Sequence, residues 1–224
     1  SSASVTINPT PNGSIASAGT VCTGSDMSLT FNATAGTGPF SLVVNGTTYP
    51  SVTNGVPFNV GTTGTAPAQS IWPNGVGITR NADADAVNLG VKFRSSVGGQ
   101  ITGIRFYKDV LQTGTNIGNL WSSTGTNLGT VTFTPNATQG WQQANFTTPV
   151  TILPNVTYVA SYFTPNGHYY SEAGYFTSSG VTNGALTAVQ TGVDGVNGVY
   201  LYSTTPGFPN QPPGNTNYWV DVVF

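Results

Sequence analysis

The chain has 224 residues, of which five are Lys or Arg and seven are Asp or Glu, so only 12 side chains carry charge. The formal net charge of −2 excludes the basic stripe of a nucleic-acid-binding protein, so we expect no nucleic-acid partner. No apolar run approaches the length of a membrane-spanning helix, so the sequence predicts no transmembrane segment. The sequence opens without a basic, apolar leader, and we expect any signal peptide to have been removed.

Neutral polar residues replace the missing charges. The chain contains 35 Thr, 21 Asn and 29 Gly. Thr favours strands, whereas Asn and Gly favour turns, so the composition predicts an all-β protein. A neutral surface of this kind is typical of extracellular fibres and adhesins, and we therefore expect a secreted, extracellular or cell-surface protein. The single Cys22 cannot form a disulfide within the chain.

The uneven distribution of charge predicts two domains. Residues 1–79 contain one charged residue, Asp26, whereas all five basic residues lie between Arg80 and Lys108. We expect a first domain over residues 1–64, a linker over 65–69 and a second domain over 70–224.

The first domain begins with a segment of strict alternation. Val5 and Ile7 share one face of the predicted strand Ser4–Asn8, and Asn12-Gly13 predicts a turn after it. Further strands are expected at 27–31, 40–44, 47–49 and 56–60. This number is close to a small Ig-like sandwich but below its usual seven strands, so the domain is expected to lack a final strand.

The second domain has more strands. Leu89, Val91 and Phe93 alternate on one face, and Ile104 and Phe106 on another. The remaining strands are expected at 129–134, 141–147, 156–163, 199–202 and 217–224. No helical period persists over three turns, so we predict an antiparallel β-sandwich of jelly-roll type without a helix longer than one or two turns.

Residues 3–62 resemble a known repeat. The motifs that carry this resemblance are Val5-Thr6-Ile7-Asn8-Pro9-Thr10-Pro11, Gly19-Thr20-Val21-Cys22 and Gly36-Thr37-Gly38-Pro39-Phe40. They are similar to the Ig-like repeats of Bacteroidetes surface adhesins. Such repeats end in a further Thr- and Tyr-rich strand, which is not found after Phe58-Asn59-Val60.

A second resemblance covers about residues 70–224. It rests on Leu89-Gly90-Val91-Lys92-Phe93-Arg94, Gly103-Ile104-Arg105-Phe106-Tyr107-Lys108, Gly140-Trp141-Gln142, Gly167-His168-Tyr169 and Asn217-Tyr218-Trp219-Val220-Asp221-Val222. This series is similar to a bacterial family known only as a domain of unknown function, which occurs in large secreted proteins beside Ig-like and sugar-binding modules. The resemblance implies a secreted β-sandwich and no particular activity.

The residues needed for most enzyme chemistry are scarce. The only His and the only Cys, His168 and Cys22, fall in different predicted domains, and Glu172 is the only Glu. The sequence has too few of these residues to favour a nucleophile–base pair, a zinc site or a facing pair of catalytic carboxylates. We therefore expect a protein without enzymatic activity.

Calcium is the one metal that the sequence favours. Asn81, Asp83 and Asp85 place amide and carboxylate oxygens at alternate positions just before the first strand of the second domain. Hard cations prefer such oxygen clusters, so a structural calcium ion is a hypothesis. The alternative is a solvated loop whose acids offset Arg80.

Basic side chains share the outward faces of two predicted strands. Lys92 and Arg94 point away from Val91 and Phe93, and Arg105 and Tyr107 point away from the second strand's core. If these strands pair as neighbours, the four side chains form a row that contacts an acidic glycan or a partner subunit. The alternative is a charged hairpin that protects a sheet edge.

Aromatic residues beside turns suggest a glycan site. Trp121, Tyr169 and Tyr170 are candidates for stacking on sugar rings. The alternative, which the sequence favours, is burial in the core, where sandwiches also place Trp and Tyr. Both faces of the last strand are apolar, so Asp221 is predicted to be a buried carboxylate that needs an Arg or an ion.

The best functional hypothesis is an extracellular structural or adhesive protein, with other copies of itself as its partner. The missing strand of the first domain would be supplied by Ala3–Asn8 of another copy, anchored by Val5 and Ile7, which gives a filament. Two competing accounts are that this strand packs in its own domain, or that residues 65–72 complete the sheet. The alternative function is a carbohydrate-binding module, with a glycan as partner.

Overall fold

The computed structural model describes residues 12–17, 26–44, 47–62, 68–73, 79–211 and 214–224. The chain divides into two compact units, residues 1–67 and 68–224. All regular elements of the described residues are antiparallel strands, which confirms the predicted all-β sandwich class. None of these residues belongs to a helix that is long and apolar enough to cross a membrane.

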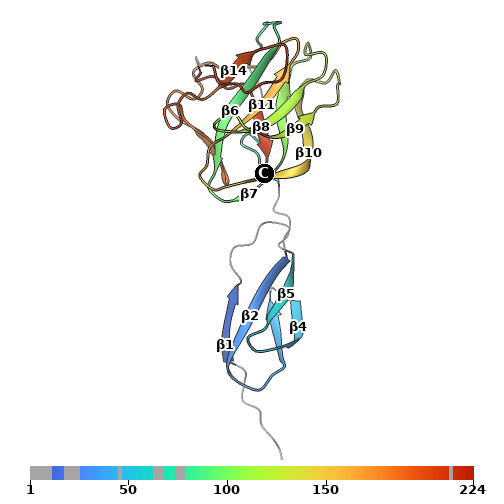
Figure 1. Cartoon of the computed structure of the whole chain (residues 1–224), viewed down its shortest axis with the longest axis vertical. Coiled ribbons are helices and arrows are strands. Elements are labelled where there is room, and N and C mark those ends of the chain that lie inside the picture. The colour runs from blue at the N-terminus through green and yellow to red at the C-terminus, as the bar shows by residue number, and fades with distance from the viewer. Residues whose placement is uncertain (1–11, 18–25, 45–46, 63–67, 74–78, 212–213) are drawn as a thin grey trace, which may run out of the picture. The chain divides into compact units, whose positions relative to one another are not determined.

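The smaller unit contains two short sheets. Its strands are β1 (Asn12–Ser17), β2 (Asp26–Ala35), β3 (Phe40–Val44), β4 (Thr47–Val52) and β5 (Pro57–Thr62). One sheet has the order β1-β2-β5, with β1 at its edge, and the other is the hairpin β3-β4 (Figure 1). The predicted strand Ser4–Asn8 lies outside the described residues.

The strand β1 was not expected, because Asn12-Gly13 indicates a turn. The structure instead places these two residues at the start of β1, where the pairing with β2 shifts its register. A β-bulge accommodates the same local bend that a turn would use. The other four strands lie where the alternation predicts them.

The core of the smaller unit is thin. Three apolar side chains are buried among its described residues: Phe31, Phe40 and Val52. The rings of Phe31 and Phe40 meet edge-on at 5.0 Å, and Tyr49 lies 5.5 Å from Phe58. Thus β3 packs over β2, and β4 packs over β5.

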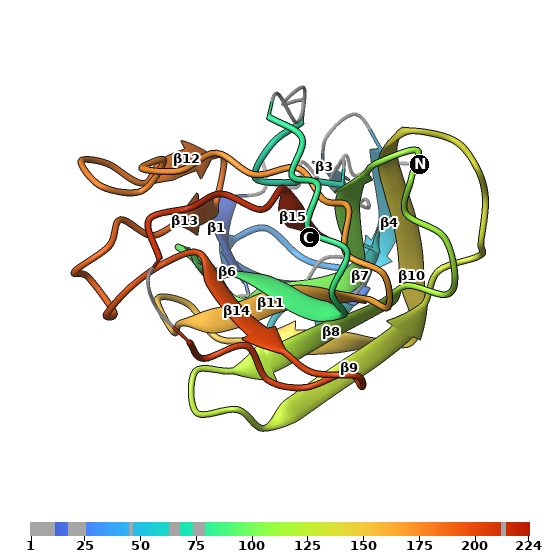
Figure 2. The same ribbon diagram turned by 90° about the horizontal axis from the view of Figure 1, so that it is seen from above.

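The larger unit is a two-layer sandwich of ten strands. They are β6 (Val87–Ser95), β7 (Gly99–Lys108), β8 (Ile117–Ser122), β9 (Asn127–Thr132), β10 (Gly140–Ile152), β11 (Tyr158–Thr164), β12 (Val181–Asn183), β13 (Leu186–Ala188), β14 (Val199–Tyr202) and β15 (Val220–Val223). One sheet has the order β10-β7-β15, and the other β12-β13-β6-β11-β8-β9 with β14 also paired to β6. Figure 2 shows β14 running beside β6 in this second sheet.

Aromatic rings join the two layers of the larger unit. Phe106 of β7 stacks on Tyr162 of β11 with ring centroids 4.3 Å apart, and it meets Phe133 edge-on at 4.8 Å. Leu89 and Phe93 of β6 are buried in the same core, as the alternation predicts. One continuous core of buried side chains thus joins the two layers.

The last strand is buried on both faces, as predicted, and it carries a buried carboxylate. Asp221 Oδ1 accepts a hydrogen bond of 2.8 Å from the backbone N–H of Ile71, and Oδ2 accepts one of 3.1 Å from that of Trp72. Arg105 Nε lies 3.6 Å from Oδ2 and supplies the predicted positive charge. These contacts offset part of the cost of burying the carboxylate, and burial still raises the pKa of Asp221 above its usual value.

The segment before the first strand of the larger unit is fixed to β15. Gln69 and Phe224 exchange two backbone hydrogen bonds of 2.8 and 2.9 Å. Asp221 accepts hydrogen bonds from the backbone just after Gln69, at Ile71 and Trp72. Residues 69–72 therefore belong to the larger unit. We considered that residues 65–72 complete the sheet of the smaller unit, and for residues 69–72 this is wrong. Residues 65–67 lie outside the described residues.

We expect Asp221→Ala to lower the free energy of unfolding of the larger unit by about 3 kcal/mol, because it leaves Arg105 and two backbone N–H groups without their buried partner. Chemical denaturation measures this loss, and hydrogen exchange should show faster exchange at the amides of Ile71 and Trp72. Asp85→Ala, at an exposed position and measured in excess chelator so that no calcium ion contributes, serves as the control and should change stability by less than about 0.5 kcal/mol. An unchanged stability of the Asp221 variant would contradict this role.

Candidate functional site

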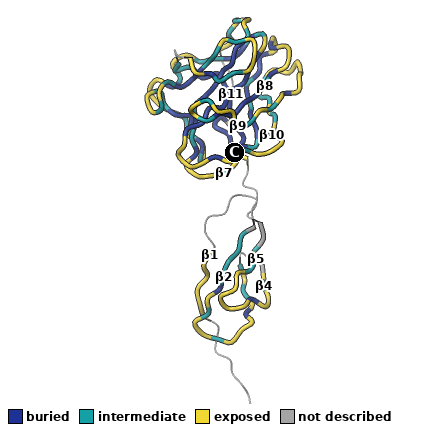
Figure 3. The backbone as a smooth tube through the Cα atoms, viewed as in Figure 1, coloured by how far each residue is buried: buried dark blue, intermediate teal, exposed yellow. Residues whose placement is uncertain are grey.

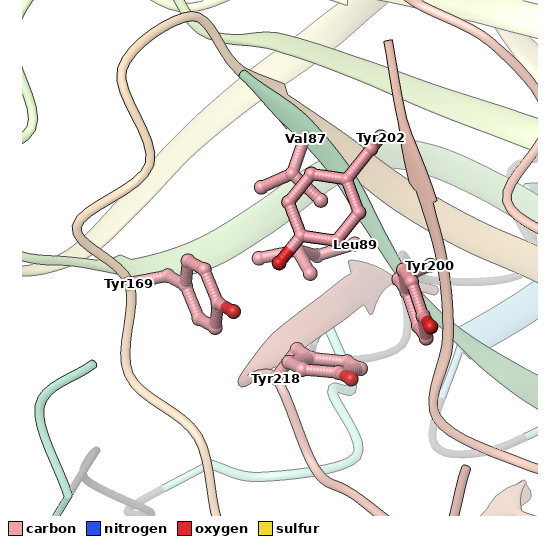
Figure 4. Close-up of a pocket in the computed structure, with 6 residues that line it drawn as sticks. All are labelled: Val87, Leu89, Tyr169, Tyr200, Tyr202 and Tyr218. Atoms are coloured by element: carbon pink, nitrogen blue, oxygen red, sulfur yellow. The ribbon is translucent and has the colours of Figure 1, made fainter. Parts of the chain in front are cut away.

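Four tyrosines surround a hollow on the larger unit (Figure 4). Its volume is about 190 Å³, and it is lined by Val87, Leu89, Tyr169, Tyr200, Tyr202 and Tyr218. We call it the tyrosine hollow. Val87 and Leu89 are 0% and 1% exposed, so the hollow reaches the apolar core, whereas Tyr202 is 49% exposed and forms its outer rim.

Strand pairing brings these tyrosines together from distant parts of the chain. Tyr200 and Tyr202 are alternate residues of β14, so both point to one side, and they pair directly with Leu89 and Val87 of β6. Tyr169 follows β11 and forms an isolated bridge with Lys108 at the end of β7. The Tyr169 and Tyr218 rings meet edge-on at 5.9 Å, which completes the ring of side chains.

The Asp83 carboxylate links two of the tyrosines. Its Oδ2 accepts a short hydrogen bond from the Tyr202 hydroxyl and one of 3.4 Å from the Tyr169 hydroxyl. Burial is the main cause that raises the pKa of Tyr169, and the nearby Tyr202 and Asp83 raise it further. The hydrogen bond to Asp83 is the main cause that raises the pKa of Tyr202. Burial also raises the pKa of Tyr218 to about 12. All three phenols are therefore neutral near pH 7.

The predicted calcium loop folds around its own backbone. Asn81 Oδ1 accepts a hydrogen bond from the Asp83 N–H, and Asp83 Oδ1 accepts one from the Asp85 N–H. Both carboxylate oxygens of Asp83 thus already have hydrogen-bond donors. Within the described residues, no three His, Cys, Asp or Glu side chains gather as a metal-binding group. A calcium ion here would have to replace these hydrogen bonds.

Calcium binding by Asn81, Asp83 and Asp85 stays a prediction, and chelation tests it. A bound ion stabilises only the folded state, so excess chelator should lower the melting temperature of the larger unit and added calcium should restore it. Calorimetry with and without chelator measures the difference. Identical melting curves would exclude the ion.

The expected row of basic residues does not form. It required the strands of Lys92 and Arg105 to be neighbours, but β6 and β7 lie in different sheets. The neighbours of β6 are β11, β13 and β14, and those of β7 are β10 and β15. The sequence period correctly predicts which side chains share a face of one strand, but it does not identify the neighbouring strand.

Lys92 and Arg94 share one face and both contact Asp194. Arg94 Nη2 lies 2.6 Å from Asp194 Oδ1, Arg94 Nε donates to Thr157, and Lys92 Nζ donates to the Asp194 carbonyl. Burial would raise the pKa of Asp194, but the hydrogen bonds from Thr157 and Arg94 outweigh it, so the pKa lies below its usual value. These two basic residues stabilise the loop after β13 and are not free to bind an acidic glycan.

Arg105 and Tyr107 of β7 contact Trp141 of β10, the neighbouring strand in the same sheet. The Arg105 guanidinium lies 4.3 Å from the Trp141 ring centroid, and Tyr107 meets the same ring edge-on at 5.7 Å. Arg105 also approaches Asp221, so its charge is used inside the unit. Arg105, Tyr107 and Trp141 thus pack against one another, and Arg105 does not form an exposed basic surface.

The three predicted sugar-stacking residues are buried. Trp121, Tyr169 and Tyr170 are 7%, 6% and 6% exposed. Trp121 donates its indole N–H to Ser161, Tyr170 packs against Tyr107, and only Tyr169 lines the tyrosine hollow. The interpretation of these residues as part of the core is thus the better one. Tyr200 and Tyr218 were not expected at a site, although the alternation of Tyr200 with Tyr202 indicates a shared face.

In the smaller unit, one face of the β1-β2-β5 sheet is covered at β2 but is not covered by any described strand at β1. Ile15 of β1 pairs directly with Phe31 of β2, so both side chains point to the same side of the sheet. Phe31 is 5% exposed because β3 covers it, whereas Ile15 is 51% exposed. All six residues of β1 are exposed (Figure 3). The Phe31 ring lies against the side-chain position of Gly13, so the part of this side that stays open is formed by Ile15 and Ser17, and we call it the uncovered face.

The free edge of β3 borders the uncovered face. Because β4 lies over β5 and β3 over β2, the next position in the second layer would lie over β1. Among the described strands, β3 pairs only with β4, so no described strand occupies its other edge. The place for one more strand is therefore defined by an apolar side chain and a free strand edge. Val5 and Ile7, the predicted anchors, lie outside the described residues.

Comparison with known families identifies the larger unit. The model of a family described as "Domain of unknown function (DUF4082)" matches residues 74–220. This match confirms the predicted resemblance over about residues 70–224, while the resemblance of residues 3–62 to Ig-like repeats stays a prediction. No curated protein and no solved structure matches the chain.

Proposed function

The chain belongs to the DUF4082 family, and on that premise we propose that it is an extracellular structural or adhesive protein whose copies join by β-strand addition. In this assembly, the smaller unit of one copy accepts residues 3–8 of another at the uncovered face. The proposal assigns the larger unit to the body of the subunit and the smaller one to the joint. A head-to-tail contact of this kind produces an open filament.

The exposure of Ile15 is the observation that carries the proposal. A side chain on the core side of a sandwich is normally covered, and Ile15 faces the same side as the buried Phe31 yet is 51% exposed. A strand added at the free edge of β3 would pair with its backbone and cover Ile15 at the same time. Such added strands bind through main-chain hydrogen bonds and are selected by alternate side chains.

Residues 4–8 match what the uncovered face requires. Val5 and Ile7 alternate with polar residues, so one face of this segment is apolar and the other is polar. Pro9 follows directly and cannot donate a backbone hydrogen bond, which favours an end to strand pairing there. The resemblance of residues 3–62 to surface-adhesin repeats supports an extracellular setting for this contact.

The distribution of charge favours close packing of copies. All five basic side chains have partners inside the larger unit. The three arginines form ion pairs, Arg80 with Asp109, Arg94 with Asp194 and Arg105 with Asp221. The two lysines donate to backbone carbonyls, Lys92 Nζ to that of Asp194 and Lys108 Nζ to that of Asp109. With a net charge of −2 over 224 residues, neighbouring copies repel one another only weakly.

The alternative, a carbohydrate-binding module, has less support. A sugar-stacking groove needs two or three exposed rings, but Tyr202 is the one aromatic residue that is largely exposed in the part of the chain that the structure describes. Trp121 and Tyr170, the other expected contacts, are buried. We therefore rank assembly above glycan binding.

Paired substitutions in the donor segment test the assembly. We expect Val5→Asp with Ile7→Asp to abolish filaments, because two carboxylates would be buried at the joint. The matched control is Ser4→Asp with Thr6→Asp, which adds the same charge to the opposite face and should preserve filaments. Negative-stain microscopy and sedimentation measure assembly, and thermal melting verifies the fold of each subunit.

The acceptor side is tested in the same way. Ile15→Asp should prevent assembly, whereas its neighbour Ser14→Asp, on the other face of β1, should not. Deletion of residues 1–8 should also abolish filaments, and a free peptide of residues 3–8 at 100 times its Kd should stabilise the truncated subunit by about 2.7 kcal/mol. Normal assembly of the truncated protein would contradict the proposal. A monomeric full-length chain that only loses stability on deletion would show that the strand packs within its own unit.

A further inference from the structure

We propose that the tyrosine hollow binds a compact alkylated ammonium group, such as the head of a quaternary amine. This inference concerns the larger unit alone and goes beyond the proposed assembly. It rests on the arrangement of four aromatic walls and on the chemistry of the floor (Figure 4), and on the Asp83 carboxylate that contacts two of the walls.

The tyrosine rings enclose a space and do not form a flat platform. The planes of Tyr169 and Tyr218 meet at 73°, and those of Tyr200 and Tyr202 at 75°. A sugar ring stacks on an exposed aromatic face, whereas a cation is attracted by several ring faces that surround it. Perpendicular walls on more than one side therefore favour a rounded cation over a flat pyranose.

A carboxylate contacts two walls of the hollow. Asp83 accepts hydrogen bonds from the hydroxyls of Tyr169 and Tyr202, and no basic residue lines the hollow. A phenol that donates to a carboxylate becomes richer in electron density, which strengthens the attraction of its ring for a cation. The Asp83 carboxylate therefore lies beside two of the four rings that line the hollow.

The floor selects the type of cation. Val87 and Leu89 at its base are both buried aliphatic side chains and offer no oxygen ligand. A metal ion or a hydrated ammonium ion would lose its water there without replacement. Methyl groups attached to a charged nitrogen fit both surfaces, since they contact the aliphatic floor while the charge lies among the rings.

A pair of ligands that differ only in charge tests the proposal. The full-length chain is titrated with choline and with its neutral analogue 3,3-dimethylbutan-1-ol, by calorimetry and by tyrosine NMR shifts, in a buffer that contains chelator. We expect saturable binding of choline and of tetramethylammonium, and at least tenfold weaker binding of the neutral alcohol. Equal binding of the alcohol, or no saturable binding of either cation, would overturn the proposal. Methyl glycosides that bind here in place of the cations would also overturn it.

Variants connect the binding to the hollow. Tyr202→Leu removes one wall at an exposed position and should weaken choline binding at least tenfold, whereas Tyr202→Phe retains the ring and should bind within about threefold of the parent. Asp83→Asn should weaken binding of choline but not of the neutral alcohol, and Asp85→Asn in the same loop should change neither. Melting temperatures verify that each variant is folded. Unaltered choline binding in both Tyr202→Leu and Asp83→Asn would place the cation elsewhere and refute the assignment.

Discussion

A β-sheet with an apolar face must cover that face, and the two units of this protein meet this requirement to different degrees. In the larger unit, β7 and its neighbours cover the β6–β11–β8 face, and stacked rings such as Phe106 and Tyr162 fill the space between them. Among the described strands of the smaller unit, three face two, so no described strand of the second layer lies over β1. The exposed Ile15 follows directly from this unequal number of strands, and so does the proposal that another copy supplies the missing strand.

The scarcity of charge has a second consequence. The few ionic groups of the larger unit mostly act inside it: Asp221 fixes the chain at Ile71 and Trp72, and Asp194 gathers Lys92 and Arg94. The surface is left to Thr, Asn, Gly and Ser, which bind water without long-range repulsion between copies. A protein of this kind can pack densely with itself, which agrees with a structural role better than with the recruitment of charged partners.

The sequence was informative where a property depends on one strand alone. The period of two identified Leu89, Val91 and Phe93 as core residues. The apolar faces around Asp221 indicated a buried carboxylate that needs an Arg or an ion, and the structure places Arg105 beside it. It was not informative where a property depends on which strands are neighbours. Lys92 and Arg105 lie in different sheets, and the tyrosine hollow combines Tyr169 with Tyr200 and Tyr218 from three separate segments. Asn12-Gly13 misled for another reason, because a bulge at the start of a strand uses the same residues as a turn.

The central claim is that the strand beside β3 comes from another copy, and solid-state NMR of mixed-label filaments measures this directly. Filaments are assembled from copies labelled with ¹³C only and copies labelled with ¹⁵N only, so a contact between the two labels joins different molecules. The account predicts contacts between the ¹³C methyl groups of Val5 and Ile7 and the ¹⁵N amides of β3. Contacts of Val5 and Ile7 with β3 that appear only within uniformly labelled copies, and never between the two labels, would contradict it.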